Sequence, residues 1–467
     1  MTIGQHVTTG GLTNGVRDDF PAKSINPADS HERTPWLLGF LCLLIPILPA
    51  FVVPAGPLKS NGSPAKLIAV LLFGLATLGF IFVRRTTSTR TLRPGVIIIV
   101  LYFVLQLAIY GVGLTRMDTE IVQASKTRAL IILVANVGVA LYILSRVRTI
   151  RQRNFILGCL ATGLVFACLV ALLQALTSAN IDLRFLFQPP GFVTNIDPEN
   201  LVAQERLGAT RVGGTSTHPI EFSVLAAVTV PLTIYFARNA ARRAVRWAAA
   251  LACGLALVTM PAAGSRTGVL ALLVALLVYM FNFKVHQLAR ALVAGSAMVV
   301  SYIALFPNFA QALWGAITGA RQDTSILDRI ADYARVSRTF RDNPVFGLGL
   351  GGAPPDQYGL LDNEWLRAIV QGGVVGVTAM IVLAGGGIFG LAAALRRATT
   401  PVERDQAYML GSMFIAMLAS SYTFDLFFYQ QATLIFFIVF GLLWSNFAVS
   451  LPDGQNGAKR APQRTRH

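Results

Sequence analysis

The sequence predicts an all-α polytopic membrane protein with about twelve transmembrane helices. Hydrophobic residues make up 54% of the chain and charged residues 13%, and the mean hydropathy is +0.60. These values lie far from the composition of a soluble domain. Apolar runs of about 20 residues, long enough to span a bilayer core, recur along the chain. We expect spans at roughly 36–54, 66–83, 95–114, 129–145, 155–176, 219–237, 247–263, 266–282, 288–306, 365–388, 407–423 and 427–448.

The positive charge sets the expected orientation of these spans. If the N-terminus is cytoplasmic, most of the 39 Lys and Arg residues fall on the inner side, in short loops and the two tails. The inner clusters are Arg84/Arg85, Arg146/Arg148, Arg242/Arg243 and Arg396/Arg397. Both termini are therefore expected in the cytoplasm. Because this explains most of the net charge of +17, nucleic-acid binding is not expected.

The predicted organisation is uneven between the two sides of the membrane. Two long loops, about 177–218 and 307–364, face outward, whereas the inner loops are short. We expect disordered cytoplasmic tails at 1–34 and 449–467, a membrane scaffold at 35–176 and a catalytic membrane region at 177–448. The four cysteines fall within apolar segments, so we expect buried thiols and no disulfide framework.

The second outer loop contains an amphipathic pattern. Apolar residues recur at helical spacing from Ile326 to Phe340, and Arg329 and Arg338 are among the arginines on the remaining surface. The pattern predicts a helix at the outer membrane face, ended by Asn343-Pro344. The glycines of GLGLGG then predict a flexible or tightly turning segment that leads back to the next span.

Three outer-side motifs combine polar groups with the start of a span. The first is PAAGSRTGVLALL, residues 261–273, in which Arg266 begins a helix after a short turn. Such an arginine either snorkels to the membrane interface or binds a diphosphate, because its planar fork matches phosphate oxygens. The backbone donors at the helix start would add to a phosphate site.

The second motif is RVGGTSTHPIEF, residues 211–222. Arg211 precedes a Gly-Gly turn, and His218-Pro219 opens a helix that carries Glu221 in its first turn. Either Thr217 or His218 caps the helix and Glu221 complements its dipole, or His218 or Glu221 contacts sugar hydroxyls or relays a proton. Arg211 is a candidate for a second phosphate contact.

The third motif is GLLDNEWLRAIVQGGVVG, residues 359–376. Asp362 or Asn363 suits a helix N-cap, and Glu364 suits a first turn. Capping needs only one such residue, yet Arg367 follows as well, so a site at the outer tip of this helix is the alternative. Gly372 and Gly376 predict close helix packing below it.

Several other kinds of site find no support in the sequence. It contains no phosphate-binding P-loop, dinucleotide fingerprint, metal-ligand cluster or G-x-S-x-G motif. We therefore expect no cofactor and no metal ion.

Four segments in this order resemble the O-antigen ligase/polymerase family of bacterial envelope glycosyltransferases. They are RVGGTSTHP, SRTGVLALL, DNPVFGLGLGG and DNEWLRAIVQGGVVG, which lie between about 205 and 390. The resemblance implies a glycosyltransferase of the C type in the inner membrane, with a large periplasmic loop between late helices. It also implies a donor glycan on undecaprenyl diphosphate, an inverting transfer without a metal, and arginines that neutralise the diphosphate. Arg266 and Arg211 match the family's arginines.

One position departs from the ligases of the family. They commonly have a histidine before the asparagine, where this chain has Asp362 before Asn363. The Asp-Asn form is more similar to the exopolysaccharide polymerases, so we favour a repeat-unit polymerase over a ligase. The predicted roles are diphosphate binding by Arg266 and Arg211, aided by Arg329 or Arg338, and deprotonation of the acceptor by Asp362 or Glu364. Asn363 would orient the acceptor.

Two other classes of membrane protein remain as alternatives. A lipid-linked oligosaccharide flippase should carry charges deep in a cavity and show internal repeats. A peptidoglycan-type membrane glycosyltransferase shares the lipid donor and a large outer loop. The family motifs favour the first interpretation, with a flippase and a chain-length regulator as expected partners.

Overall fold

A computed structural model of the chain describes residues 34–56, 62–82, 91–177, 190–195, 205–206, 209–287, 289, 296, 324–359, 361–445 and 449–450. The predicted tails and the predicted span at 288–306 fall almost entirely outside these residues. So do large parts of the two predicted outer loops.

Helices dominate the described residues, which confirms the predicted all-α membrane class. In chain order they are α1 (Trp36–Ile47), α2 (Pro64–Phe82), α3 (Pro94–Leu114), α4 (Glu120–Arg146), α5 (Ile150–Thr177), α6 (Pro219–Asn239), α7 (Arg243–Ala262), α8 (Arg266–Met280), α11 (Thr324–Asp342), α12 (Pro355–Tyr358), α13 (Glu364–Arg397), α14 (Pro401–Ser420) and α15 (Gln430–Trp444). The strands are β1 (Val52–Pro54), β2 (Thr91–Leu92), β3 (Phe192–Thr194), β4 (Glu205–Arg206), β5 (Ala209–Thr210) and β6 (Val449–Ser450). They form three short antiparallel pairs: β1–β3, β2–β6 and β4–β5.

Seven helices within the described residues are long and apolar enough to cross a membrane: α2, α3, α4, α5, α6, α7 and α13. The shorter helices α1, α8 and α15 are also apolar. Each predicted span outside 288–306 overlaps one helix, but the first is shorter than expected. Helix α1 ends at Ile47, just before Pro49, and Val52–Pro54 pair with Phe192–Thr194 as a strand instead of continuing the helix.

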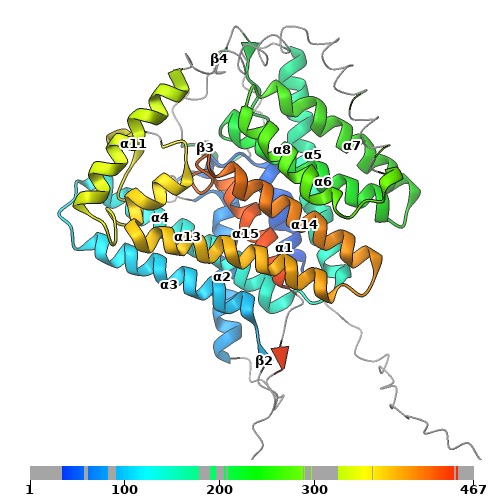
Figure 1. Ribbon diagram of the computed structural model, residues 1–467, viewed down its shortest axis with the longest axis horizontal. Coiled ribbons are helices and arrows are strands. Elements are labelled where there is room, and N and C mark those ends of the chain that lie inside the picture. The colour runs from blue at the N-terminus through cyan, green and yellow to red at the C-terminus, as the bar shows by residue number, and fades with distance from the viewer. Residues whose placement is uncertain are drawn as a thin grey trace, which may run out of the picture. The chain divides into compact units, whose positions relative to one another are not determined.

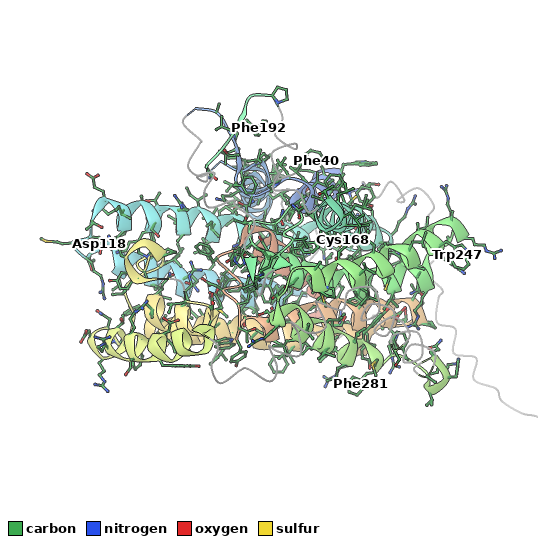
Figure 2. The ribbon with its side chains drawn as sticks, turned by 90° about the horizontal axis from the view of Figure 1, so that it is seen from above. Phe40, Asp118, Cys168, Phe192, Trp247 and Phe281 are labelled. Carbon is green, nitrogen blue, oxygen red and sulfur yellow. The ribbon has the colours of Figure 1, made fainter. Side chains whose placement is uncertain are left out.

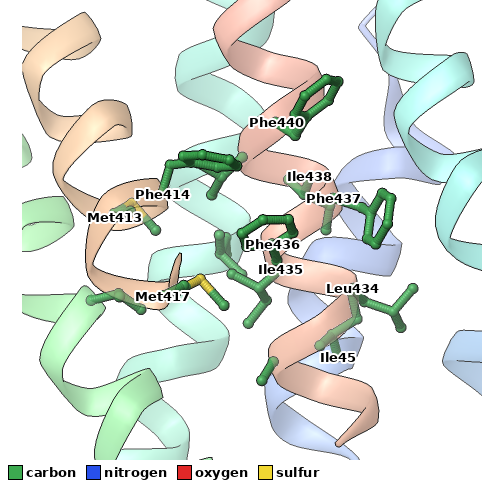
Figure 3. Close-up of a cluster of buried hydrophobic side chains, with 14 of the residues drawn as sticks. Ile45, Met413, Phe414, Met417, Leu434, Ile435, Phe436, Phe437, Ile438 and Phe440 are labelled. Atoms are coloured by element: carbon green, nitrogen blue, oxygen red, sulfur yellow. The ribbon is translucent and has the colours of Figure 1, made fainter. Parts of the chain in front are cut away.

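Helix α15 is the buried centre of the helical region. It packs against α1, α3, α4, α6, α13 and α14 (Figure 1), and every residue from Gln431 to Trp444 is buried. Phe414 of α14 stacks on Phe436 of α15 with ring centroids 4.7 Å apart, and Phe440 lies next to the same ring (Figure 3). Because lipid is as apolar as these side chains, such a core is held by close packing more than by exclusion of water.

The outer faces of the helices are apolar, and their ends separate as the predicted topology requires. Trp247 is 63% exposed and Phe281 is 75% exposed, both at the periphery (Figure 2). Asp118, predicted on the outer side, and Trp247, predicted near the inner side, lie at opposite ends of Figure 2. The pair β1–β3 joins the end of the first predicted span to the first predicted outer loop, and β2–β6 joins two predicted inner segments. The inward or outward orientation of each end remains a prediction.

Helix α13 is broken below its first two turns. Gly373 has a non-helical backbone (φ 56°, ψ −144°), and the segment after α11 fills the break. The amides of Leu348 and Gly349 donate to the carbonyls of Val370 and Gln371 at 2.8 and 2.9 Å. Farther along, the amides of Val374 and Val375 donate to the carbonyls of Pro344 and Val345 at 2.9 and 3.1 Å. The predicted glycine turn is thus a packed segment that satisfies the freed backbone groups of a membrane helix.

The turn between α3 and α4 holds this glycine segment from the other side. Arg116 donates through Nη2 to Asn343 Oδ1 at 2.7 Å and to the Gly347 carbonyl at 2.6 Å. Lys126 is 1% exposed, donates to the Gly113 carbonyl at 2.6 Å, and forms an ion pair with Asp118. The predicted scaffold half therefore contributes charged contacts that position the outer end of α13.

A Gly349→Ala variant tests this packing. Gly349 has φ +95°, and an added Cβ would lie 2.5 Å from Gly113 Cα. Backbone strain and the clash should together destabilise the protein by about 2–4 kcal/mol. Thermal unfolding in detergent measures the loss. Gly111→Ala is the matched control on α3, because an added Cβ there meets nothing within 4 Å. An equal drop in Tm for both variants would contradict the proposed contact.

Candidate active site

The three outer-side motifs meet around one short loop between α14 and α15, residues Ser421–Tyr429, called the α14–α15 loop below. Thr267 of α8 shares a hydrogen bond with Thr423 through their hydroxyls at 3.1 Å. The His218 ring, before α6, lies 5.8 Å from the Tyr429 ring. The start of α13 contacts the loop through both its backbone and its side chains. Segments separated by more than 200 residues thus gather at one end of the helices.

Asn363 is the N-cap of α13. Its Oδ1 accepts from the amides of Trp365 and Leu366 at 2.9 and 3.3 Å. This decides which of the two predicted residues caps the helix. Asp362 is exposed and precedes the cap, so its carboxylate is not needed for helix capping.

Glu364 is buried (5% exposed) and bonded to the α14–α15 loop. Its amide donates to the Ser421 carbonyl at 2.9 Å, and its Oε2 accepts from the Phe427 amide at 2.8 Å. The Glu364 side chain also hydrogen-bonds the side chain of Asp425, which is bridged to Arg367 Nη1 at 2.9 Å. The carboxyl group of Glu364 and the guanidinium group of Arg367 therefore hold the α14–α15 loop in place.

An aromatic pair continues this contact toward the surface. Trp365 donates from Nε1 to Ser421 Oγ at 3.0 Å and stacks on Tyr422 with centroids 5.3 Å apart. Tyr422 is 58% exposed, and Asp362, three residues before Trp365, is exposed as well. The start of α13 thus presents one exposed carboxylate and an exposed aromatic surface.

Glu221 joins the start of α6 to the start of α15. The side chain is 0% exposed, and its Oε1 accepts from the amides of Gln431 and Ala432 at 3.0 and 3.1 Å. Its Oε2 accepts from the Thr217 amide at 3.0 Å. A carboxylate at a helix N-terminus is favoured by the dipole and by the orphan amides there. Glu221 therefore caps α15, a helix that the sequence did not connect with it.

A Glu221→Ala variant is expected to be strongly destabilised. It would leave three buried backbone amides without their acceptor, at a cost of about 3–5 kcal/mol. Glu221→Gln keeps one acceptor oxygen and should lose less. Thermal unfolding in detergent compares the two variants with wild type, and a wild-type Tm for the alanine variant would contradict the capping role.

Arg211 and Arg266 both adjoin a single turn, Ala263–Ser265, which is called the arginine turn below. Arg211 donates from Nε to the Ala263 carbonyl at 2.8 Å, and its side-chain carbons lie against Gly264, whose φ is +59°. Arg266 is the first residue of α8, and the Ser265 side chain makes no capping hydrogen bond to the helix amides. Two guanidinium groups therefore sit beside a helix N-terminus, an arrangement suited to binding an anion.

Tyr429 links the arginine turn to the carboxylates. Burial raises the pKa of Tyr429, and the charges of Glu221, Asp425 and Asp362 raise it further, whereas Arg211 lowers it. These effects need all four charged groups to lie within electrostatic range of one phenol. Arg211 and Asp362, 151 positions apart by their numbers, thus both lie within electrostatic range of Tyr429.

Of the other predicted site residues, the structure describes the side chains of some but not of all. His218 accepts the Ile220 amide through Nδ1 at 3.1 Å and so caps α6. The predicted loop helix is confirmed as α11; Val336 is buried against Leu361 and Val370, and Arg338 is exposed on the other side. The side chain of Arg329 lies outside the described residues, so its predicted role is untested.

Several residues of the site were not singled out by the sequence patterns. Asp425, Tyr429 and Gln431 lie on or next to the α14–α15 loop, between two apolar runs that left only a few residues for a turn. The sequence signal that could have indicated this part of the site is Asp425, a lone carboxylate between two predicted spans. Within the described residues, no group of three His, Cys, Asp or Glu side chains could hold a metal ion.

Comparison with known proteins agrees with this picture. Residues 251–395 match the family model described as O-antigen ligase. The match includes α8 with Arg266, and α13 with Asp362 and Glu364, but excludes Arg211 and the α14–α15 loop. No curated protein matches the chain. The chain is thus a helical membrane protein, and its residues 251–395 are similar to the O-antigen ligase family.

Proposed function

We propose that this protein transfers a glycan from undecaprenyl diphosphate to a sugar hydroxyl at the outer face of the inner membrane, as a polysaccharide repeat-unit polymerase. The observation that carries the proposal is that the turn between Arg211 and Arg266, the start of α6 and the start of α13 meet around the α14–α15 loop. Cations for a diphosphate and an exposed carboxylate are the two groups that such a transfer needs. The family match supports activity of this general type.

The donor side of the reaction falls to the arginine turn. Arg266 and Arg211 would bind the diphosphate oxygens, together with the amides at the start of α8. As the bond from the anomeric carbon to the phosphate oxygen breaks, that oxygen takes the electron pair and gains negative charge. Fixed cations stabilise this charge without reorganising, which is the largest contribution expected from the site.

The acceptor side falls to Asp362. Its carboxylate takes the proton of the acceptor hydroxyl while the hydroxyl oxygen attacks the anomeric carbon from the face opposite the leaving group. The anomeric configuration is therefore inverted. Glu364 and Asn363 position Asp362 by fixing the start of α13, which assigns Glu364 a supporting role instead of the alternative role as base.

Analysis of the lipid-linked glycan pool in a deletion strain tests the assignment. A polymerase predicts accumulation of single repeat units exposed on the outer side. Accumulation of long lipid-linked chains would favour a ligase, and repeat units confined to the cytoplasmic side would favour a flippase. Either of the last two results would overturn the polymerase assignment, and only the flippase result would also overturn glycan transfer.

A further inference from the structure

A polar pocket lies at the end of the helices opposite to the candidate active site. It is a partly open pocket between α5, α13, α14 and α15, with a water-accessible volume of about 40 Å³. Helix α13 begins at the candidate site and ends at Arg397, while α15 also begins there and ends at Trp444. The pocket is lined near these distal ends, and its lining includes Arg153, Arg397, Glu403, Gln406, Leu410 and Leu442. It therefore cannot serve the reaction proposed above.

Two arginines and one carboxylate are among the charged residues that line this pocket. Arg153 has a buried Nε that donates to no atom among the residues that the structure describes. Glu403 attracts Arg153 electrostatically, but its Oε2 already accepts from the amide and hydroxyl of Thr399 at 2.9 and 2.8 Å. It also completes a capping box with Thr400 at the start of α14. The pocket lining therefore carries a net positive charge, and Arg153 can still donate a hydrogen bond to a ligand.

The rest of the pocket lining is largely apolar. Leu442 is 1% exposed and Leu443 is 4% exposed, and Leu410 and Ala393 also belong to this apolar lining. A free inorganic anion gains nothing from such a lining. A lipid headgroup does, because its acyl chains continue along apolar helix surface.

We propose that this pocket binds the phosphate of an anionic phospholipid from the leaflet at that end, with Arg153 and Arg397 as its ligands. Arginine forks bind phosphate oxygens through paired donors. Basic pockets between membrane helices at the cytoplasmic side are suited to anionic headgroups, and the predicted topology places this end in the cytoplasmic leaflet. The bound lipid links α5 to α13 and α14.

Native mass spectrometry of the purified full-length chain tests the site. The protein in non-ionic detergent is titrated with dioleoylphosphatidylglycerol and, separately, with dioleoylphosphatidylcholine. We expect tighter binding of the anionic lipid, and about fivefold weaker binding of it by each of Arg153→Gln and Arg397→Gln, which corresponds to about 1 kcal/mol per arginine. Arg397 is exposed, so its variant stays informative if Arg153→Gln fails to fold.

Arg396→Gln is the matched control, because Arg396 is an exposed neighbour outside the pocket lining. It should bind the anionic lipid as wild type does. Equal losses from Arg396→Gln and Arg397→Gln, or no loss from Arg397→Gln, would overturn the pocket as the site. Complete displacement of the lipid by inorganic phosphate would show a phosphate-ion site and overturn the lipid assignment, whereas retention of the lipid supports it.

Discussion

An Arg266→Ala variant is expected to lose about 10²–10³-fold in glycan transfer while keeping its fold. Arg266 opens α8 beside Arg211 and is only partly buried, so its removal leaves no core cavity. In the proposed reaction its guanidinium neutralises charge that grows as the diphosphate leaves. An interaction that strengthens in the transition state lowers kcat when it is lost, more than it raises KM.

The measurement is transfer from a purified lipid-linked donor, with products separated by length, alongside a thermal unfolding curve. Arg243→Ala is the matched control, because Arg243 is the first residue of α7 but lies at the other end of the helices. The control should keep wild-type activity. Normal products from Arg266→Ala would contradict the proposed role of Arg266 in binding the diphosphate.

An Asp362→Asn variant is expected to lose at least about 100-fold in activity with an unchanged Tm. The asparagine has the same shape but cannot take a proton from the acceptor hydroxyl. Because Asn363 makes the capping hydrogen bonds to Trp365 and Leu366, the start of α13 does not depend on Asp362. A loss of activity without loss of stability is therefore specific to the proposed base.

Glu364→Gln separates the two carboxylates of this motif. The amide oxygen of glutamine can still accept from Phe427, and its nitrogen can donate to Asp425, so the loop should stay in place. We expect activity within a few-fold of wild type, in the range that positioning contacts allow. If Glu364→Gln were inactive and Asp362→Asn active, the roles of the two residues would have to be exchanged.

Much of the fold can be predicted from the sequence, because each membrane span is recognisable as a long apolar run. Helices α2 to α8 and α13 lie where the apolar runs predicted them, and the amphipathic pattern predicted α11. The end of α1 was misplaced because hydropathy ignores Pro49 and the pairing of β1 with β3. The break in α13 was also missed, because it depends on a distant segment that replaces the helical hydrogen bonds.

The candidate site could be predicted in part. Arg211, Arg266 and Asp362 were each visible as polar groups at the outer ends of spans. The meeting of their segments at the α14–α15 loop could not be predicted, because it depends on how helices distant in the sequence pack against one another. For the same reason the contacts of Glu221 with Gln431 and Ala432, at the start of α15, could not be predicted from the sequence.

The lipid-linked glycan pool of a deletion strain complemented with Asp362→Asn tests the central claim most directly. The account predicts that wild type restores long chains, whereas the variant, present in the membrane at wild-type level, leaves single repeat units on the outer side. Restoration of long chains by Asp362→Asn would contradict a transfer reaction in which this carboxylate is the base.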